Sequence, residues 1–260
     1  MPGTIHTRSE GGVGTLVFDH PERRNAVSVN MWAALPDALA GFAQDPDVRV
    51  VVMRGAGDKA FVSGADISQF DEQRSGDNHA GYDDAAALAF LALASFDKPL
   101  IAMIHGYCIG GGLAIALTAD LRYADEHSRF AIPAARLGVG YHMGGVGDLA
   151  ALVGMSTALE IFYTARKFDA DEALRTGLVN AIVPATELEA HVQGVAAQIS
   201  ENAPLTIRAV KLAAQELSRP DGKRDYARVN AAVAACYASE DYKEGIAAFL
   251  GKRRPAFRGR

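Results

Sequence analysis

Cysteine is scarce in this sequence of 260 residues, and only Cys108 and Cys236 occur. Two distant thiols build neither a disulfide framework nor a metal-binding cluster, so we expect no metal site and a reducing, cytoplasmic setting. Long apolar runs are missing as well, since none approaches the ~18 residues of a membrane-spanning helix. Residues 1–6 lack a basic stretch followed by an apolar one, so no secretory leader is expected.

An excess of positive charge is also missing. The net charge is −5, and no basic run alternates with aromatic residues, so we expect neither nucleic acid nor a membrane surface as a partner. The single basic cluster lies at the end of the chain, in residues 252–254 with Arg258 and Arg260. This cluster is either a solvated tail or a tail that docks onto another surface or binds phosphate.

Several enzyme motifs are absent too. No serine lies in the Gly-x-Ser-x-Gly context that an α/β-hydrolase needs. Residues 145–150 fit the letters Gly-x-Gly-x-x-Ala, but glycine-rich residues precede them instead of a strand, which argues against dinucleotide binding. A Walker A motif and a Cys/His metal cluster are also missing.

What is present is an alternation of short apolar runs and amphipathic stretches. Residues 4–8 and 13–19 alternate around glycines and predict a β-hairpin, and Ser28 is a suitable N-cap for a following helix. We expect buried strands over 48–53, 99–104 and 121–124, a loop over 71–84 and a helix over 85–96. This order predicts an α/β fold with a largely parallel sheet.

The pattern changes after residue 145, where helical periodicity dominates. The expected helices are 145–164, 170–176, 187–201, 205–217, 225–238 and 241–250, with one short strand over 178–183. No internal repeat or long linker divides the chain. We therefore predict an α/β core over 1–195 that continues into a helical C-terminal region over 196–260.

Two glycine-containing turns stand out at strand ends. In the first, Phe61–Val62 is followed by Ser63, Gly64, Ala65 and Asp66; an ordinary turn is the simple interpretation. In the second, residues 106–113 place three consecutive glycines before an apolar helix, which suits either close packing or an anion at the exposed N–H groups. Together the two turns could direct two backbone donors at one oxygen, as thioester chemistry requires.

These motifs and their order resemble the enoyl-CoA hydratase/isomerase (crotonase) family over nearly the whole chain. The residues that carry the resemblance are His20–Ala26, Gly64–Ile67, the glycine triplet, Phe130–Gly138, Lys252–Arg253 and Pro255–Phe257. The resemblance implies a ClpP/crotonase-like spiral of ββα turns. It also implies a C-terminal helical trimerisation region, and hence a homotrimer or a dimer of trimers.

The same resemblance implies the chemistry of the site. Ala65 and Gly111 would donate their N–H groups to the carbonyl oxygen of an acyl-CoA thioester, and coenzyme A would be part of the substrate instead of a separate cofactor. Basic side chains such as Lys211 would be available to its phosphates. The residues expected to contact the coenzyme are Arg24, Ala26, Ser63, Gly64, Asp66, Ile67, Gly110, Ala134 and Leu137.

The chain departs from the family at two positions. Hydratases of the family resemble one another in two glutamates that act as an acid/base pair, and this chain has Ala114 and Ala134 there. An alanine methyl can neither take nor give a proton, so the two-glutamate hydration is excluded. His142 falls where some relatives place a catalytic aspartate, and Tyr141 is a hydrogen-bond donor beside it.

The sequence therefore predicts an acyl-CoA enzyme that stabilises a thioester enolate. Isomerisation, decarboxylation, hydrolysis and an unconventional hydration stay open as its reaction. The alternative hypothesis is an acyl-CoA-binding homologue with little catalysis. The simple interpretation of His142 and Tyr141 is that they are packed or solvated side chains. The two hypotheses differ in whether turnover depends on these two residues.

Overall fold

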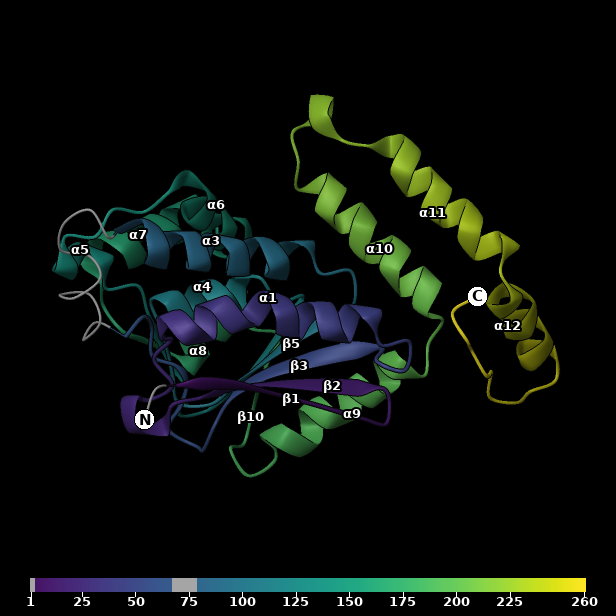
Figure 1. Cartoon of the computed structure of the whole chain (residues 1–260), viewed down its shortest axis with the longest axis horizontal. Coiled ribbons are helices and arrows are strands. Elements are labelled where there is room, and N and C mark those ends of the chain that lie inside the picture. The colour runs from purple at the N-terminus through teal and green to yellow at the C-terminus, as the bar shows by residue number, and fades with distance from the viewer. Residues whose placement is uncertain (1–2, 67–78) are drawn as a thin grey trace.

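A computed structural model describes residues 3–66 and 79–260, so the predicted contact Ile67 lies outside the described residues. A six-stranded sheet forms the centre of the molecule, in the order β1-β2-β3-β5-β7-β10 (Figure 1). The antiparallel β1–β2 pair is the predicted hairpin, and the remaining neighbours are parallel, as predicted. The strands are β1 (Thr4–Glu10), β2 (Val13–Asp19), β3 (Val50–Gly55), β5 (Leu100–Ile104), β7 (Leu121–Asp125) and β10 (Ala181–Val183).

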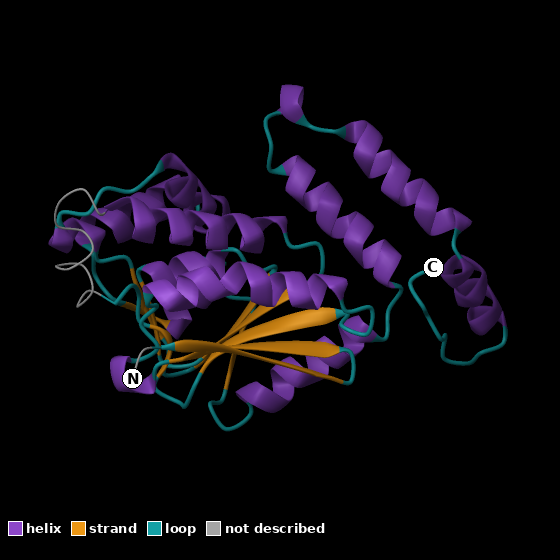
Figure 2. Ribbon diagram, viewed as in Figure 1, coloured by secondary structure: helices purple, strands orange, loops and turns teal. Residues whose placement is uncertain are grey.

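Side chains of the central strands alternate between two apolar cores. Val51 and Met53 of β3 pack with the helices α1 (Val29–Gln44) and α4 (Gly111–Leu117), whereas Val50 and Val52 pack against α9 (Leu188–Ser200). This period of two explains why the strands are continuous apolar runs, since both faces of a parallel sheet are covered by helices. Figure 2 shows α1 on one side of the sheet and α9 on the other.

Helix boundaries follow local signals in most cases. The Ser28 hydroxyl oxygen accepts the Met31 N–H at 3.4 Å and caps α1, as predicted. The prediction of one helix over 145–164 is wrong, because Gly154 adopts φ 79° and separates α6 (Met143–Val153) from α7 (Met155–Thr164). The predicted loop over 71–84 is also wrong at its end, because α3 (His79–Ser95) begins at residue 79.

A second, four-stranded sheet was not predicted from the sequence. Its order is β4-β6-β8-β9, with β4 (Ala60–Val62), β6 (Tyr107–Ile109), β8 (Arg129–Ala131) and β9 (Phe168–Asp169). Three successive turns of the chain each give one strand to the large sheet and the next to the small one: β3 then β4, β5 then β6, β7 then β8. This spiral places the ends of β4 and β6 side by side, and both predicted glycine turns begin there.

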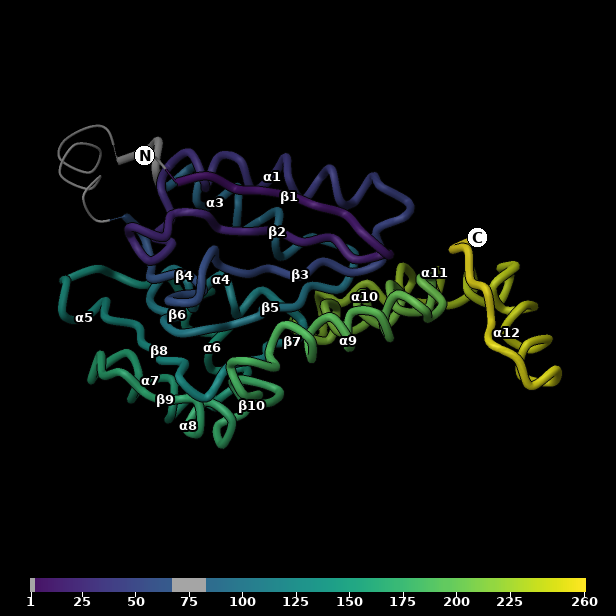
Figure 3. The backbone as a smooth tube through the Cα atoms, turned by 90° about the horizontal axis from the view of Figure 1, so that it is seen from below, coloured from purple at the N-terminus to yellow at the C-terminus, as the bar shows by residue number. Residues whose placement is uncertain are grey.

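The C-terminal helices extend away from the two sheets. The helices α10 (Pro204–Leu217), α11 (Tyr226–Ala238) and α12 (Glu240–Leu250) lie to one side of the α/β layers in both views (Figures 1 and 3). The predicted division between 195 and 196 stays a prediction, and α9 spans this position. Among the described residues, no helix is long and apolar enough to cross a membrane. The remaining elements are η1 (Pro21–Arg23), α5 (Ala134–Leu137), α8 (Ala170–Arg175) and η3 (Asp221–Lys223).

Candidate active site

The first half of the site is the backbone turn after β4. Gly64 adopts φ 113°, a conformation that residues with a Cβ rarely take, and its carbonyl oxygen accepts the Val27 N–H at 2.8 Å. The Asp66 N–H donates to the Val27 carbonyl at 3.1 Å, so both peptides that flank Ala65 are held. The Ala65 N–H itself has no acceptor among the described residues.

The second half is the glycine-rich start of α4. Gly110 has φ 55° and ψ −117°, which only glycine adopts without strain, and it turns the chain from β6 into the helix. A Cβ on Gly112 would lie 2.0 Å from the Val62 carbonyl oxygen, so close packing also requires glycine there. Gly111, between them, has an N–H without an acceptor in the described part of the chain, as expected for the first residue of a helix.

The two halves are in direct contact. A Cβ built on Gly111 would lie 3.6 Å from the Ala65 backbone nitrogen, and one built on Gly64 would lie 3.8 Å from the Gly111 nitrogen. Both N–H groups lack acceptors among the described residues, and their two peptides lie side by side in space. One small acceptor atom can therefore approach both of them. The helix dipole of α4 adds partial positive charge at the same point.

Three cavities meet at Gly111. The smallest, of about 160 Å³, brings together many of the residues predicted from the sequence. Its lining includes Ser63, Gly64, Ala65, Gly110, Gly111, Ala134, Leu137 and Tyr141. The other two have volumes of about 420 and 570 Å³ and include Gly111 and His142 in their lining.

The residues predicted to transfer protons begin α6. Tyr141 packs edge-on against Phe162 with ring centroids 4.7 Å apart, and burial raises the pKa of its phenol, so the hydroxyl stays protonated and can donate a hydrogen bond. His142 is the exposed N-cap residue of α6, and its side chain accepts no capping hydrogen bond. Ala114 faces the 420 Å³ cavity with His142, whereas Ala134 lines the smallest cavity with Tyr141.

A basic pair lies at one side of this region. The Arg24 guanidinium lies over the Tyr107 ring, 4.9 Å from its centroid, and the Lys167 ammonium lies 5.3 Å from the same centroid. Both side chains are exposed, and Ala26 is buried close by in sequence. Lys167 was not predicted from the sequence, since only the strand pairing of β8 with β9 brings residues after α7 to this place.

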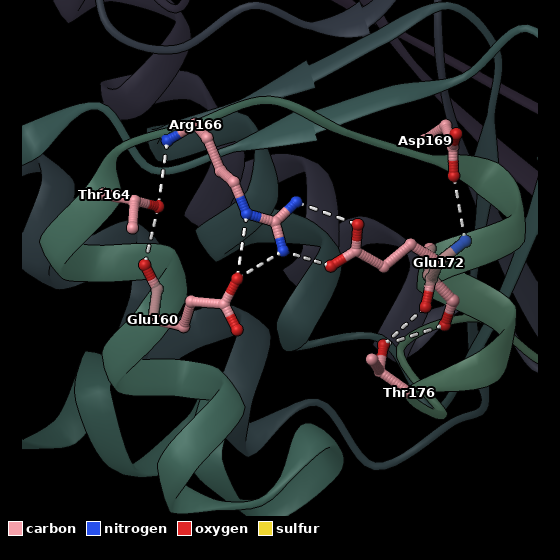
Figure 4. A network of polar contacts seen from close by, with 7 residues as sticks. Glu160, Thr164, Arg166, Asp169, Glu172 and Thr176 are labelled. Atoms are coloured by element: carbon pink, nitrogen blue, oxygen red, sulfur yellow. Dashed lines mark hydrogen bonds and ion pairs between the residues drawn. The ribbon is translucent and has the colours of Figure 1, made fainter.

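The segment that carries Lys167 is held by its neighbour Arg166 (Figure 4). The Arg166 guanidinium donates to Glu160 of α7 at 2.8 and 3.1 Å and to both carboxylate oxygens of Glu172 of α8. These hydrogen bonds lower the pKa of the Glu172 carboxyl. Arg166 therefore joins two helices across the short strand β9 and orders the residues next to Lys167.

Other basic side chains have partners that draw them away from a ligand. The Lys211 ammonium lies 2.8 Å from the Asp120 carboxylate and donates to the Lys98 carbonyl, so it joins α10 to the core. In the terminal cluster, Arg253 pairs with Glu244. Asp66, predicted as a coenzyme contact, is buried and lies 3.5 Å from Arg23.

Two carboxylates near the site were not singled out from the sequence. Asp148 of α6 lines the 420 Å³ cavity with Ala114, and Asp83 of α3 lines the 570 Å³ cavity with Ala65. Burial raises the pKa of the Asp148 carboxyl. The helical spacing from Tyr141 to residues 145 and 148 is the signal that could have placed Asp148 on the same side of α6.

Comparison with known proteins agrees with this geometry. The profile described as enoyl-CoA hydratase/isomerase matches residues 8–260. The chain belongs to the enoyl-CoA hydratase/isomerase family. It is 34% identical to a crotonyl-CoA hydratase of Syntrophomonas wolfei over 253 residues, which cover 97% of each chain. It is also 34% identical to a carnitinyl-CoA dehydratase of Salmonella typhi over the full length of both.

Solved structures of this family have the same fold. An enoyl-CoA hydratase/carnithine racemase from Magnetospirillum magneticum superposes with a TM-score of 0.92 at 34% identity, covering 99% of this chain and 96% of that one. An enoyl-CoA hydratase/isomerase family protein from Hyphomonas neptunium also gives a TM-score of 0.92. The crotonase-like α/β fold that the resemblance implied is therefore confirmed.

Proposed function

We propose that the chain is an acyl-CoA enzyme that holds the thioester carbonyl oxygen between the N–H groups of Ala65 and Gly111. The supporting observation is the adjacency of two backbone donors that lack acceptors among the described residues, at the point where three cavities meet. Negative charge grows on this oxygen as an enolate or a tetrahedral species forms, and donors fixed in advance stabilise that charge without rearrangement. Coenzyme A is part of the substrate, and the proposal needs no other cofactor.

The coenzyme portion would lie between the basic pair and the oxyanion donors. Arg24 and Lys167 flank Tyr107 with no carboxylate paired to either among the described residues, so their charges are available to phosphate groups. The other proposed contacts are Ala26, Ser63, Gly64, Asp66, Ile67, Gly110, Ala134 and Leu137. This arrangement uses backbone and small side chains where the thioester must approach closely.

The proton-transfer groups would differ from those of the family's two-glutamate hydratases. Ala114 and Ala134 carry no acid or base, so His142 and Tyr141 are the proposed replacements at the start of α6. An imidazole can both accept and donate a proton, and the phenol can hold a developing charge by a hydrogen bond. We propose a reaction through a thioester enolate, by isomerisation, decarboxylation or an unconventional hydration, with hydrolysis as a reaction of the same oxyanion donors.

The absence of both carboxylates also favours a second candidate. With alanines at the two positions, the chain could bind acyl-CoA thioesters in the same cavities and convert them slowly or not at all. The two candidates share the oxyanion donors and differ in whether side chains at α6 accelerate a reaction.

The test is a panel of acyl-CoA thioesters assayed for both binding and turnover. The wild-type chain is expected to bind acyl-CoA and to convert at least one member. Ala65→Pro removes one donor N–H and is expected to lower kcat about 10²-fold or more. Circular dichroism and the unfolding midpoint show whether Ala65→Pro keeps the fold. His142→Ala is expected to lower kcat while acyl-CoA binding persists.

Four outcomes of this panel would contradict parts of the proposal. Failure of the wild-type chain to bind any acyl-CoA overturns it entirely. Binding without turnover favours the second candidate. Turnover of crotonyl-CoA at the rate of ordinary hydratases would show that the two alanines do not prevent hydration, and full activity of His142→Ala would exclude the role of His142.

The assembly we propose is a homotrimer or a dimer of trimers in the cytoplasm, built through the C-terminal helices. Phe249 and Leu250 of α12 are 84% and 75% exposed, and an apolar groove of about 620 Å³ runs between α10, α11 and α12. An isolated chain would leave this apolar surface in water, which is unfavourable. Sedimentation of the purified protein measures the assembly directly.

A further inference from the structure

The 420 Å³ cavity beside the oxyanion donors lies against Ala114. Gly111 and Ala114 of α4 form one wall of this cavity, and Phe90 and Ala94 of α3 form another. The third wall is the start of α6. Ala114 has no side-chain atom beyond Cβ. When the two donors hold the thioester carbonyl oxygen, the acyl chain of the substrate therefore has open space in this direction.

Asp148 is the single carboxylate among the described residues that line this cavity. It lies one helical turn after Gly144, so both residues share one face of α6, while Leu149 and Val153 are buried in the core. A Cβ on Gly144 would have no atom within 4 Å, which leaves the path along this face to Asp148 open. Asp148 and the donor residue Gly111 therefore line the same cavity.

The surroundings of Asp148 favour proton transfer over a structural role. Among the described residues, none forms a hydrogen bond or an ion pair with its carboxylate. Tyr141 and His142 are the other titratable groups in the cavity lining, and α3 and α4 contribute uncharged side chains only. Asp148 keeps access to solvent, and its partial burial raises the pKa of the carboxyl, which makes the carboxylate a stronger base.

We propose that Asp148 is the carboxylate that transfers the proton in this site, which leaves His142 and Tyr141 to stabilise developing charge by hydrogen bonds. Asp148 accepts a proton from the carbon next to the thioester carbonyl, and the C–H electron pair becomes an enolate whose oxygen is held by Ala65 and Gly111. With a 3-enoyl-CoA thioester, Asp148 then returns the proton to the γ-carbon, which yields the conjugated 2-enoyl thioester. The reaction needs neither a water molecule nor a second carboxylate. The inference rests on the proposed function, since the same donors must hold the substrate.

The experiment follows the proton directly. A saturated acyl-CoA is incubated with each variant in D2O, and loss of the α-proton signal is recorded by NMR; conversion of a 3-enoyl-CoA is followed by the absorbance of its conjugated product. Asp148→Asn is expected to lower both rates at least about 10²-fold. Its Kd for acyl-CoA, measured by calorimetry, is expected to stay within about twofold of wild type, since a proton-transfer role predicts loss of rate instead of affinity.

Matched variants make the result specific. Asp171→Asn makes the same change at an exposed carboxylate of α8, outside the cavity, and is expected to keep wild-type rates. Asp148→Glu keeps a carboxylate and is expected to recover part of the rate. The fall in rate on the acid side of the wild-type pH profile is expected to disappear from the residual activity of Asp148→Asn.

Several results would overturn the inference. Wild-type rates of exchange and isomerisation in Asp148→Asn exclude the proposed role of Asp148. A loss of these rates in Asp83→Asn but not in Asp148→Asn excludes it as well. A wild-type chain that binds acyl-CoA but exchanges no α-proton excludes this proton transfer while it leaves acyl-CoA binding in place. A wild-type chain that binds no acyl-CoA overturns the proposed function itself, so the two failures are distinguishable.

Discussion

The candidate site has two halves, one made of backbone groups and the other of side chains. The half that we propose to face the carbonyl oxygen consists of backbone groups, in the turn at Ala65 and the helix start at Gly111, where the absence of bulky side chains leaves the N–H groups accessible. The half that we propose to face the acyl chain consists of side chains, with Tyr141 and His142 directly before α6 and Asp148 within it, and these residues line the cavities. The backbone half is held by hydrogen bonds and close packing, whereas His142 and Asp148 of the side-chain half are exposed to solvent.

This difference indicates how the site can change its chemistry without losing its fold. Gly112 cannot accept a Cβ, because the Val62 carbonyl lies where the Cβ would be, so the backbone half tolerates little variation. Ala114, Gly144 and Asp148 face space instead of packed atoms. Substitutions at such positions can exchange one proton-transfer group for another while the donors stay in place.

The largest expected effect comes from placing a methyl group in the backbone half. Gly111→Ala adds a Cβ 3.6 Å from the Ala65 nitrogen, an ordinary contact that the fold accommodates and that places a methyl group beside this donor. We expect kcat/KM to fall about 10²–10³-fold, as for loss of an oxyanion donor, with little change in the free energy of unfolding. Steady-state kinetics and urea unfolding measure the two quantities.

Gly41→Ala is the control for this substitution. Gly41 lies in α1 with nothing within 4 Å of an added Cβ, so activity is expected to stay unchanged. If Gly111→Ala keeps full activity, the carbonyl oxygen does not lie between these two donors and the backbone half has another role.

The backbone half could be predicted from the sequence because its glycines are physically required. A positive φ at Gly64 and a clash at Gly112 restrict these positions to glycine, and such requirements leave a recognisable motif. The strands β3 and β5 were predicted for a related reason, since burial on both faces demands a continuous apolar run.

The side-chain half was predicted only in part. His142 was predicted by alignment with a family pattern, and Tyr141 as the hydrogen-bond donor beside it. Asp148 and Lys167 depend instead on which face α6 presents and on how β9 pairs with β8. The second sheet was missed for a similar reason, although a strand end was predicted at Phe61–Val62. A strand of two or three residues is too short for a periodic pattern, and its existence is decided by its partners.

The pH dependence of stability is expected to report on the backbone half. His105 follows β5 directly before the second glycine turn, is 7% exposed, and its Nε2 atom has no partner among the described residues. Burial, and secondarily Arg54, lowers its pKa below the ordinary 6.5, while Asp125 and Asp58 oppose the shift. As the pH falls, His105 is protonated in the unfolded chain at a higher pH than in the folded chain. The free energy of unfolding that His105 contributes above pH 6.5 is therefore lost as the pH falls below 6.5.

His105→Leu removes this titration. The free energy of unfolding of the wild type is expected to fall more steeply between pH 7 and pH 5 than that of the variant, by at most about 1.4 kcal/mol per pH unit. Urea unfolding at a series of pH values measures both slopes. Equal slopes would show that His105 titrates alike in the folded and unfolded chains.

The smallest expected effect on activity comes from alanine substitutions of two glycines of α6, which differ in whether they face the cavity. Neither Gly144 nor Gly147 has an atom within 4 Å of an added Cβ, so each change to alanine is expected to stabilise the helix by about 0.5–1 kcal/mol. Gly144 lines the cavity of Asp148 and Gly147 does not, so only Gly144→Ala is expected to lower kcat/KM, by severalfold and most for long acyl chains. Urea unfolding and assays with acyl-CoA thioesters of increasing length compare them, and equal activity of the two variants would place the acyl chain outside this cavity.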